Sequence, residues 1–247
     1  MVALAACSAS PSSSPTNETP KAQPSQSEPS QSEQHVVLAV NAHVSILKTA
    51  GSFAEYRDVM ASAKKLDPVV IAAAPFAYAE MQATLTPEQP ANAVMVKGVD
   101  PEQVAKILDL EHYITFGSMR ALAEPGDVPS IVIGRDLMKA LYAYTGATLT
   151  LTLVSDSSSP PRKFAFRIGS VFYTGNPDYD GHMVFASLAA VQDVLGHGDV
   201  VAGVDLRLAD ATRAPEIARR MDKALGGPPY ALMDWYQLNR ALIAKPR

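Results

Sequence analysis

A stretch that cannot form a core sets the first limit on how this chain folds. Residues 8–34 are rich in Ser, Pro, Gln and Glu and contain no Val, Ile, Leu, Phe, Trp or Tyr. Such a segment buries too little apolar surface to offset the conformational entropy that it would lose on folding. We therefore predict a disordered tether over residues 8–34 and a folded region over residues 35–247.

The single cysteine of the chain stands directly before this tether. Leu4-Ala5-Ala6-Cys7 resembles the bacterial lipobox, in which the cysteine becomes the lipidated first residue of the mature protein. Only six residues precede Cys7, and they include no basic segment. Two interpretations stay open: residues 1–7 are a signal-peptide remnant with a lipidation site at Cys7, or Cys7 is a free thiol. In the first case, Ser8 after the cysteine predicts that the lipidated protein is anchored in the outer membrane.

The charge and hydropathy of the chain exclude two classes of function. Its 21 basic and 25 acidic side chains give a net charge of −4, so no basic surplus exists to neutralise nucleic-acid phosphates. The longest nearly apolar stretch runs only from Val69 to Ala79 and contains Pro75. Because a membrane-spanning helix needs about 20 apolar residues, we predict that no segment of this sequence spans a bilayer.

Apolar periodicity in the folded region predicts both strands and helices. Leu149, Leu151 and Leu153 alternate with threonines, which is typical of a strand with one solvated face. Ser52 and Glu55 have the spacing of a capping box at the start of a helix. The predicted strands are 35–48, 69–79, 93–97, 131–133, 148–153, 163–173, 183–186 and 200–208. The predicted helices are 52–66, 100–108, 134–143, 187–195, 215–225 and a last one capped by Asp234 and Gln237. This order predicts an α+β fold in which a ferredoxin-like set of outer elements is split around an inserted, strand-rich middle lobe.

The sequence lacks the motifs of common catalytic and cofactor sites. It contains no G-x-S-x-G, no phosphate loop, no G-x-G-x-x-G and no H-E-x-x-H. Residues 178–182 resemble the start of a calcium loop, but Ala189 stands at position 12, where such a loop needs a bidentate Glu. We interpret this segment as a turn. We predict no catalytic residue, no metal ligand and no cofactor, and hence a protein that is not an enzyme.

The folded region carries short motifs in a specific order: Ala74-Pro75-Phe76, Val96-Lys97-Gly98-Val99-Asp100-Pro101, Ile131-Val132-Ile133-Gly134-Arg135, Arg167-Ile168-Gly169-Ser170-Val171-Phe172, Val201-Ala202-Gly203-Val204 and Asp234-Trp235. This series resembles the periplasmic domain of permease subunits of the bacterial lipoprotein-releasing ABC transporter, a Lol and MacB-like family. The resemblance implies a porter lobe over about 36–75 and 198–247, interrupted by an inserted β-rich sabre lobe over about 76–197. The member of this family that recruits the lipoprotein carrier has a protruding hairpin, for which the connection 155–163 is too short.

The resemblance implies a periplasmic domain that handles or docks lipoproteins or their transport machinery, held to a membrane only by lipid at Cys7. Its expected partner is an envelope protein: a lipoprotein, a carrier or an ABC permease. Two alternatives are an excised permease domain and a scaffold or regulator of an envelope complex. Exposed tyrosines beside turn-forming residues often anchor interfaces, so we predict partner contacts in one loop. The residues of that predicted contact are Tyr173, Asn176, Asp178, Tyr179 and Asp180.

Overall fold

A computed structural model of the chain describes residues 31–153 and 160–237. Cys7, the predicted tether up to residue 30, most of the connection 155–163 and the body of the predicted last helix lie outside these residues. The helices are α1 (Gln31–Val40), α2 (Tyr56–Leu66), α3 (Val104–Ile107), α4 (Arg135–Ala140), α5 (Pro177–His182), α6 (Leu188–Leu195) and α7 (Ala214–Leu225), with short 3-10 turns η1 (Leu110–Tyr113), η2 (Met119–Ala123) and η3 (Ala211–Arg213). The strands are β1 (Val44–Lys48), β2 (Val70–Thr84), β3 (Asn92–Val99), β4 (Ile114–Phe116), β5 (Ser130–Gly134), β6 (Thr148–Leu153), β7 (Arg162–Phe172), β8 (Met183–Ser187), β9 (Gly203–Leu208) and β10 (Tyr230–Asp234).

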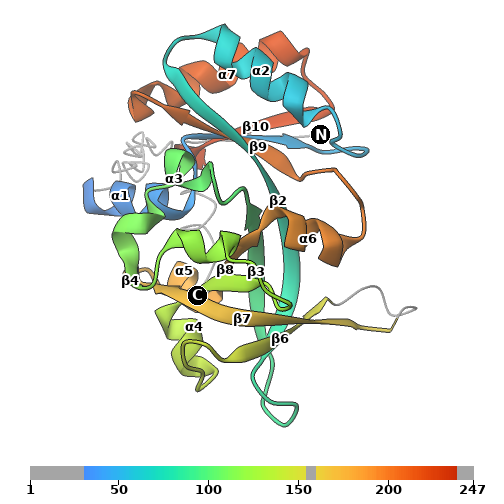
Figure 1. Ribbon diagram of the computed structural model, residues 1–247. Coiled ribbons are helices and arrows are strands. Elements are labelled where there is room, and N and C mark those ends of the chain that lie inside the picture. The colour runs from blue at the N-terminus through green and yellow to red at the C-terminus, as the bar shows by residue number, and fades with distance from the viewer. Residues whose placement is uncertain (1–30, 154–159, 238–247) are drawn as a thin grey trace, which may run out of the picture.

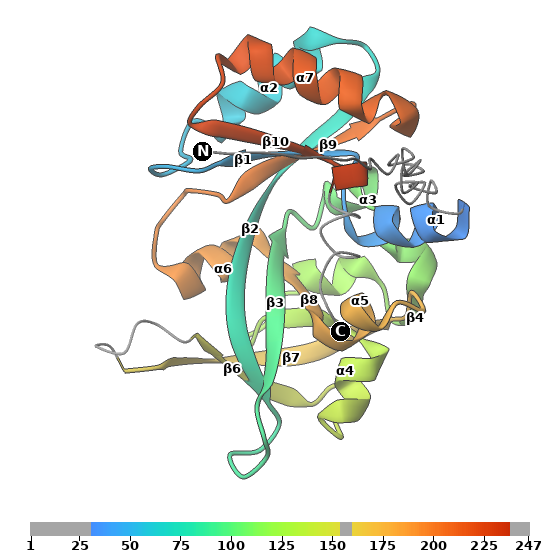
Figure 2. The same ribbon diagram turned by 180° about the vertical axis from the view of Figure 1, so that it is seen from behind.

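The porter lobe has the ferredoxin-like arrangement that the sequence predicts. Its strands lie in the order β10-β1-β9-β2 and all neighbours are antiparallel. The chain visits them as β1-α2-β2 and then, after the insertion, as β9-α7-β10. Helices α2 and α7 lie side by side on one face of this sheet, at the top of the molecule in Figures 1 and 2. The elements that build this lobe therefore come from both ends of the folded region.

The sabre lobe is a ring of strands inserted between the two halves of the porter lobe. From β2 the pairing passes through β3, β8, β5 and β7, and β6 then closes the ring by pairing with both β7 and β2. The predicted 148–153 and 163–173 hairpin is confirmed as β6 and β7. Side chains from all six strands, with others from α4 and α6, form a hydrophobic core. The α+β, two-lobed fold class is thus confirmed.

Strand β2 belongs to both lobes and runs the height of the molecule (Figure 1). Residues 70–76 pair with β9 of the porter sheet, and residues 76–83 pair with β3 of the sabre lobe. Phe76 is the only residue that both ladders share. Pro75 stands directly before it, where the β3 ladder has not yet begun, so its missing N–H costs no hydrogen bond to β3.

Two predictions about the start of the folded region fail, one in part and one wholly. The predicted strand 35–48 is confirmed only over Val44–Lys48, which form β1, and the residues before it form the helix α1, Gln31–Val40. Its apolar residues Val37, Leu38 and Val40 are buried against other elements, so the run has the composition of a buried strand without being one. The predicted capping box is also absent, because α2 begins at Tyr56 and the Glu55 carboxylate accepts hydrogen bonds from Lys48 Nζ and Tyr230 Oη instead.

The predicted cap formed by Asp234 and Gln237 is confirmed, and the polar groups at the ends of α6 and on Trp235 are also satisfied. Ser187 Oγ caps α6 by accepting from the backbone N–H of Ala190, and Gly196 ends that helix in the left-handed conformation. Asp234 and Gln237 bond reciprocally, each side chain accepting from the other residue's backbone N–H at 2.9 and 3.2 Å. Trp235 is buried in the porter core, and its indole N–H donates to the carbonyl of Ala211.

Candidate functional site

The loop predicted to contact a partner is mostly structural. Tyr179 and Asp180 are buried, so the prediction that they face a partner is wrong for these two residues. The Asp180 carboxylate accepts hydrogen bonds from Thr174 N, Thr174 Oγ1 and Gly175 N at 2.8–2.9 Å. Tyr179 Oη accepts from Asn41 Nδ2 at 3.0 Å, and burial raises its pKa to about 12.

The remaining residues of that loop are partly accessible. Tyr173 is half-buried beneath the Arg135 guanidinium, whose Cζ lies 3.2 Å from the ring centroid. Asn176 caps α5 by accepting from the backbone N–H of Asp178, and the Asp178 side chain is exposed. The segment 178–182 therefore forms a short capped helix, in place of the turn that the sequence predicted.

A cleft of about 540 Å³ opens between the two lobes. Helix α2 forms its porter wall, and the start of α6 with the loop after β3 forms its sabre wall. The lining residues are Tyr56, Arg57, Met60, Pro75, Asp100, Pro101, Gln103, Ser187, Leu188, Ala189, Gln192 and Asp199. Apolar side chains from both lobes thus share one concave surface with carboxylates, amides and one guanidinium.

The charged groups at the rim of this cleft are held in place. Arg57 Nη1 lies 2.7 Å from Asp199 Oδ2, and Tyr56 Oη donates to Asp199 Oδ1 at 2.8 Å. These two donors, Arg57 first, hold the pKa of Asp199 below its usual value, so it stays a carboxylate at neutral pH. Because α2 carries both donors and Asp199 lies in the segment just before β9, the contacts hold that segment against α2 at the surface.

A second polar cluster lies buried where the lobes meet. Lys97 Nζ on β3 is 2.7 Å from Asp205 Oδ2 on β9, and Ser45 Oγ on β1 donates to Asp205 Oδ1 at 2.6 Å. The Lys97 side chain is 1% exposed and that of Asp205 is 4% exposed. The ammonium also lies 5.0 Å from the ring centroid of Phe76 and 5.6 Å from that of Tyr78.

Electrostatics favour the charged form of Lys97 despite its burial. Desolvation alone lowers the pKa of Lys97, but the adjacent Asp205 carboxylate outweighs it and raises the pKa above the usual value. Sequence reasoning missed this pair. The available signal was a charged residue inside each of two largely apolar strands: Lys97 in 94–99, and Asp205, followed by Arg207, in 203–208.

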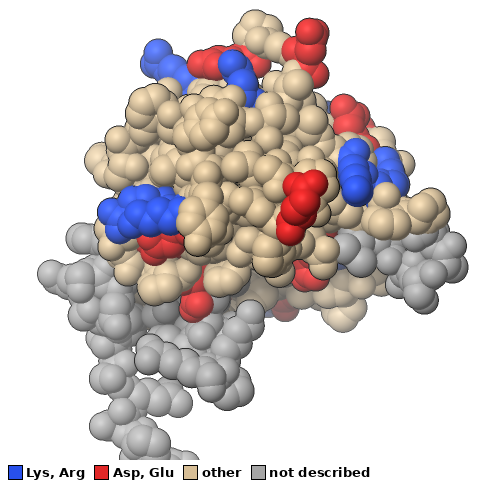
Figure 3. All heavy atoms as spheres, turned by 90° about the horizontal axis from the view of Figure 1, so that it is seen from below, with Lys and Arg blue, Asp and Glu red and all other residues tan. Residues whose placement is uncertain are grey.

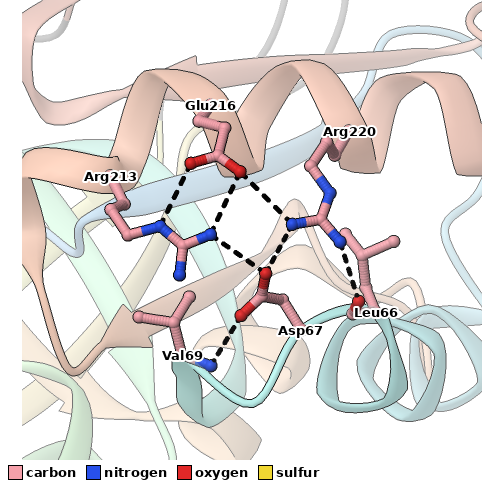
Figure 4. Close-up of polar contacts among 6 residues, drawn as sticks. All are labelled: Leu66, Asp67, Val69, Arg213, Glu216 and Arg220. Atoms are coloured by element: carbon pink, nitrogen blue, oxygen red, sulfur yellow. Dashed lines mark hydrogen bonds and ion pairs between the residues drawn. The ribbon is translucent and has the colours of Figure 1, made fainter.

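A third cluster joins the two helices that cover the porter sheet (Figure 4). Asp67, at the end of α2, accepts hydrogen bonds from Val69 N, Arg213 and Arg220. Glu216 pairs with the same two arginines. Because the Asp67 and Glu216 carboxylates share the same two arginines, we interpret the cluster as a clamp between α2 and α7.

The chain enters and leaves the porter sheet at adjacent points. The backbone N–H of Trp235, just after β10 ends, donates to the carbonyl of His43, just before β1 begins, at 3.1 Å.

At the opposite end of the molecule, the surface seen from below is largely uncharged, with a few isolated charged side chains (Figure 3). Two tyrosines of the α4–β6 turn are among the most exposed apolar side chains, with 83% of Tyr142 and 68% of Tyr144 accessible.

Among residues 31–153 and 160–237, no three His, Cys, Asp or Glu side chains gather in a way that could hold a metal ion. In the same residues, no helix is long and apolar enough to cross a membrane.

The ferredoxin-like lobe interrupted by a ring of strands is a two-lobed α+β fold that this chain shares with a periplasmic domain of known structure. The chain belongs to the family of MacB-like periplasmic core domains, whose family model matches residues 22–224. The periplasmic region of MacB from Actinobacillus actinomycetemcomitans shares this fold with a TM-score of 0.52. That match has 11% sequence identity and covers 85% of this chain and 96% of the other.

Two curated relatives are lipoprotein-releasing system transmembrane proteins named LolC. The one from Xylella fastidiosa (strain 9a5c) is 30% identical over 214 residues, which are 84% of this chain and 49% of the relative. The one from Neisseria meningitidis serogroup B (strain ATCC BAA-335 / MC58) is 25% identical over 176 residues, 70% of this chain and 41% of the relative. The chain thus spans about half the length of these relatives or less, and the family resemblance predicted from the sequence is confirmed.

Proposed function

We propose that this chain is a non-catalytic, periplasmic interaction domain that docks lipoproteins or components of their transport machinery. The observation that carries the proposal is the cleft between the lobes, which combines apolar walls with fixed polar groups in a family of transporter domains. Such a mixed, concave surface suits a protein segment with apolar side chains and a few hydrogen-bonding groups. The lobe boundaries proposed from the sequence, 36–75 with 198–247 and 76–197, divide β2 close to this cleft.

The test uses a substitution that fills the cleft without disturbing the core. Ala189 lies exposed on the sabre wall, and Ala189→Arg places a long side chain across the opening. Binding to acylated lipoproteins and to the periplasmic lipoprotein carrier is measured by biolayer interferometry on immobilised protein. We expect Ala189→Arg to weaken binding at least tenfold.

The matched control is Ala61→Arg, which adds the same side chain to an exposed position of α2 outside the cleft lining. It should bind like the unmodified chain. Unimpaired binding by Ala189→Arg, or no binding of either probe to the unmodified chain, would contradict the proposal.

The accessible part of the predicted loop remains a proposed second contact, through Tyr173, Asn176 and Asp178. Asp178→Arg reverses the charge of an exposed side chain, so it tests the contact without opening the core. A loss of binding to the lipoprotein or carrier probe supports this contact. Unchanged binding contradicts the proposal that the loop contacts a partner. Tyr179→Ala does not serve this purpose, because Tyr179 is buried and its loss would destabilise the fold.

We also propose that Cys7 is lipidated and holds the domain at the outer membrane, on the basis of the lipobox-like Leu4-Ala5-Ala6-Cys7. Intact-mass measurement on protein purified from membranes, expressed with its native upstream sequence, tests this. A mass that starts at Cys7 with a diacylglyceryl and an acyl group supports it. An unmodified chain in the soluble fraction contradicts it.

One observation favours a second candidate function. The chain spans about half of each LolC relative or less, and the start of β1 and the end of β10 lie side by side at His43 and Trp235, as expected for a domain carried between two segments of a permease. In that case it is the periplasmic part of an ABC permease, with its docking role exercised within the transporter. Sequencing the surrounding reading frame distinguishes the two candidates.

A further inference from the structure

The backbone joint between the lobes is narrow. The ladder that holds β2 to the porter sheet ends at Phe76, and the ladder that holds β2 to β3 begins there. The last β9 partner on this strand is Gly203, whose missing side chain leaves room for the Phe76 ring. A bend in β2 near Pro75 and Phe76 would change the angle between the lobes while leaving most of both ladders intact.

The buried ion pair spans this joint. Lys97 pairs with Tyr78 on one side of β2, and Asp205 pairs with Ala74 on the other side. Their contact therefore crosses β2 diagonally and passes over Phe76, with the ammonium 5.0 Å from its ring centroid. One charge belongs to the sabre lobe and the other to the porter lobe.

We propose that Lys97 and Asp205 form a pin that fixes the angle between the porter and sabre lobes. Both charges are shielded from water and each finds its compensating partner only at one separation. If the lobes rotated about Phe76 so that Lys97 Nζ and Asp205 Oδ2 moved apart by a few ångströms, each group would be left charged and uncompensated in a low-dielectric interior. Such unpaired burial of charge is costly. Apolar side chains at the same place would carry no penalty for an unpaired charge and would leave the angle less defined.

The pin also determines the shape of the cleft. Pro75 and Asp100 line the cleft and, on their other side, the small cavity that reaches Asp205. A fixed lobe angle therefore gives the cleft a fixed width. A ligand then binds to a preformed surface, and little conformational entropy is lost in ordering the cleft.

The experiment measures the distance between the lobes by double electron–electron resonance. Spin labels are attached in a Cys7→Ser background at Arg219→Cys on α7 and Thr148→Cys on β6, both exposed positions. Lys97→Met alone leaves Asp205 buried and unpaired, and that variant is expected to fold poorly. The informative variant is Lys97→Met with Asp205→Asn, which removes both charges together and keeps an acceptor for Ser45 Oγ.

We expect the double variant to remain folded by circular dichroism. Its distribution of distances between the two spin labels should be at least twice as broad as in the labelled chain that keeps Lys97 and Asp205. The control is Arg57→Gln with Asp199→Asn, which removes an ion pair of the same 2.7 Å length whose side chains are 64% and 60% exposed. That variant should keep the narrow distribution, because water already screens its charges. A narrow, unshifted distribution in the Lys97 and Asp205 variant would overturn the pin. So would equal broadening in both variants.

Discussion

His43 is a buried histidine whose protonation state affects stability. Its Nδ1 accepts from the backbone N–H of Leu208 at 3.1 Å, so the neutral ring belongs to the native structure. Burial lowers the pKa of His43 to about 4, the Arg207 charge adds to that effect, and Asp109 and Asp210 oppose it. The unfolded chain, with a histidine pKa near 6.5, therefore binds more protons than the native chain between these two values.

This difference predicts a loss of stability on acidification. The free energy of unfolding should fall as the pH drops from about 6.5 towards 4, by up to about 3 kcal/mol in total. His43→Asn keeps an acceptor for Leu208 and should flatten the curve between about pH 6.5 and 5. Urea denaturation across this range measures it. The carboxylates with lowered pKa values, such as Asp67 and Glu55, contribute only at lower pH, so an equally steep curve in the variant would rule out His43 as the cause.

Gly134 is the residue that lets α5 approach β5. A Cβ built on Gly134 would lie 2.1 Å from the carbonyl oxygen of Asp180, which is backbone and cannot move aside without shifting the helix. We expect Gly134→Ala to destabilise the fold by about 1–3 kcal/mol. Gly181→Ala, on α5 itself, meets open space and should be neutral or slightly stabilising, and thermal melts of both variants test the contrast. Equal melting temperatures would contradict this packing.

At the scale of elements, strand β7 of the β6–β7 hairpin carries two phenylalanines that differ in burial. Phe166 is 2% exposed in the sabre core, and Phe164 is only partly buried near the end of the hairpin. Phe166→Ala should cost about 3–5 kcal/mol, as truncations of core aromatic residues do. Phe164→Ala should cost clearly less, because water reaches part of its ring. Chemical denaturation of both variants checks the order, and a larger loss at Phe164 would mean that the inward face is misassigned.

The sequence predicts most of these elements, and the exceptions have physical reasons. The alternating residues of β6, the hairpin partner 163–173 and the cap formed by Asp234 and Gln237 are predicted from local signals, and each is confirmed. Helix α1 was predicted as a strand because a short apolar run buried on all sides has no periodicity that distinguishes the two. The side chains that bury α1 come from α3, η1 and β2 among other elements, which are distant in the sequence. A local sequence pattern therefore cannot report this burial.

The candidate site was harder to predict than the fold. The cleft is lined by residues from 56 to 199 that only the tertiary structure brings together. The loop was predicted from tyrosines beside turn formers, but Tyr179 is buried, and its Oη accepts a hydrogen bond from Asn41, which follows α1 and is 138 residues away in the sequence. Composition alone does not distinguish a tyrosine that anchors an interface from one that completes a core.

At the scale of the whole molecule, the two lobes share one core as well as one strand. A hydrophobic cluster combines Ala72 and Ala74 of the porter side of β2 with Val132, Phe172 and Phe185 of the sabre lobe, and with α1 and η1. We therefore expect one cooperative thermal transition in differential scanning calorimetry, with equal calorimetric and van't Hoff enthalpies. Two resolved transitions would show that the lobes unfold independently.

The hydrogen bond between Trp235 and His43 places the first and last strands of the porter sheet side by side. The start of β1 and the end of β10 therefore lie about one strand spacing apart, so a longer polypeptide could carry this sheet without its flanking segments having to move apart.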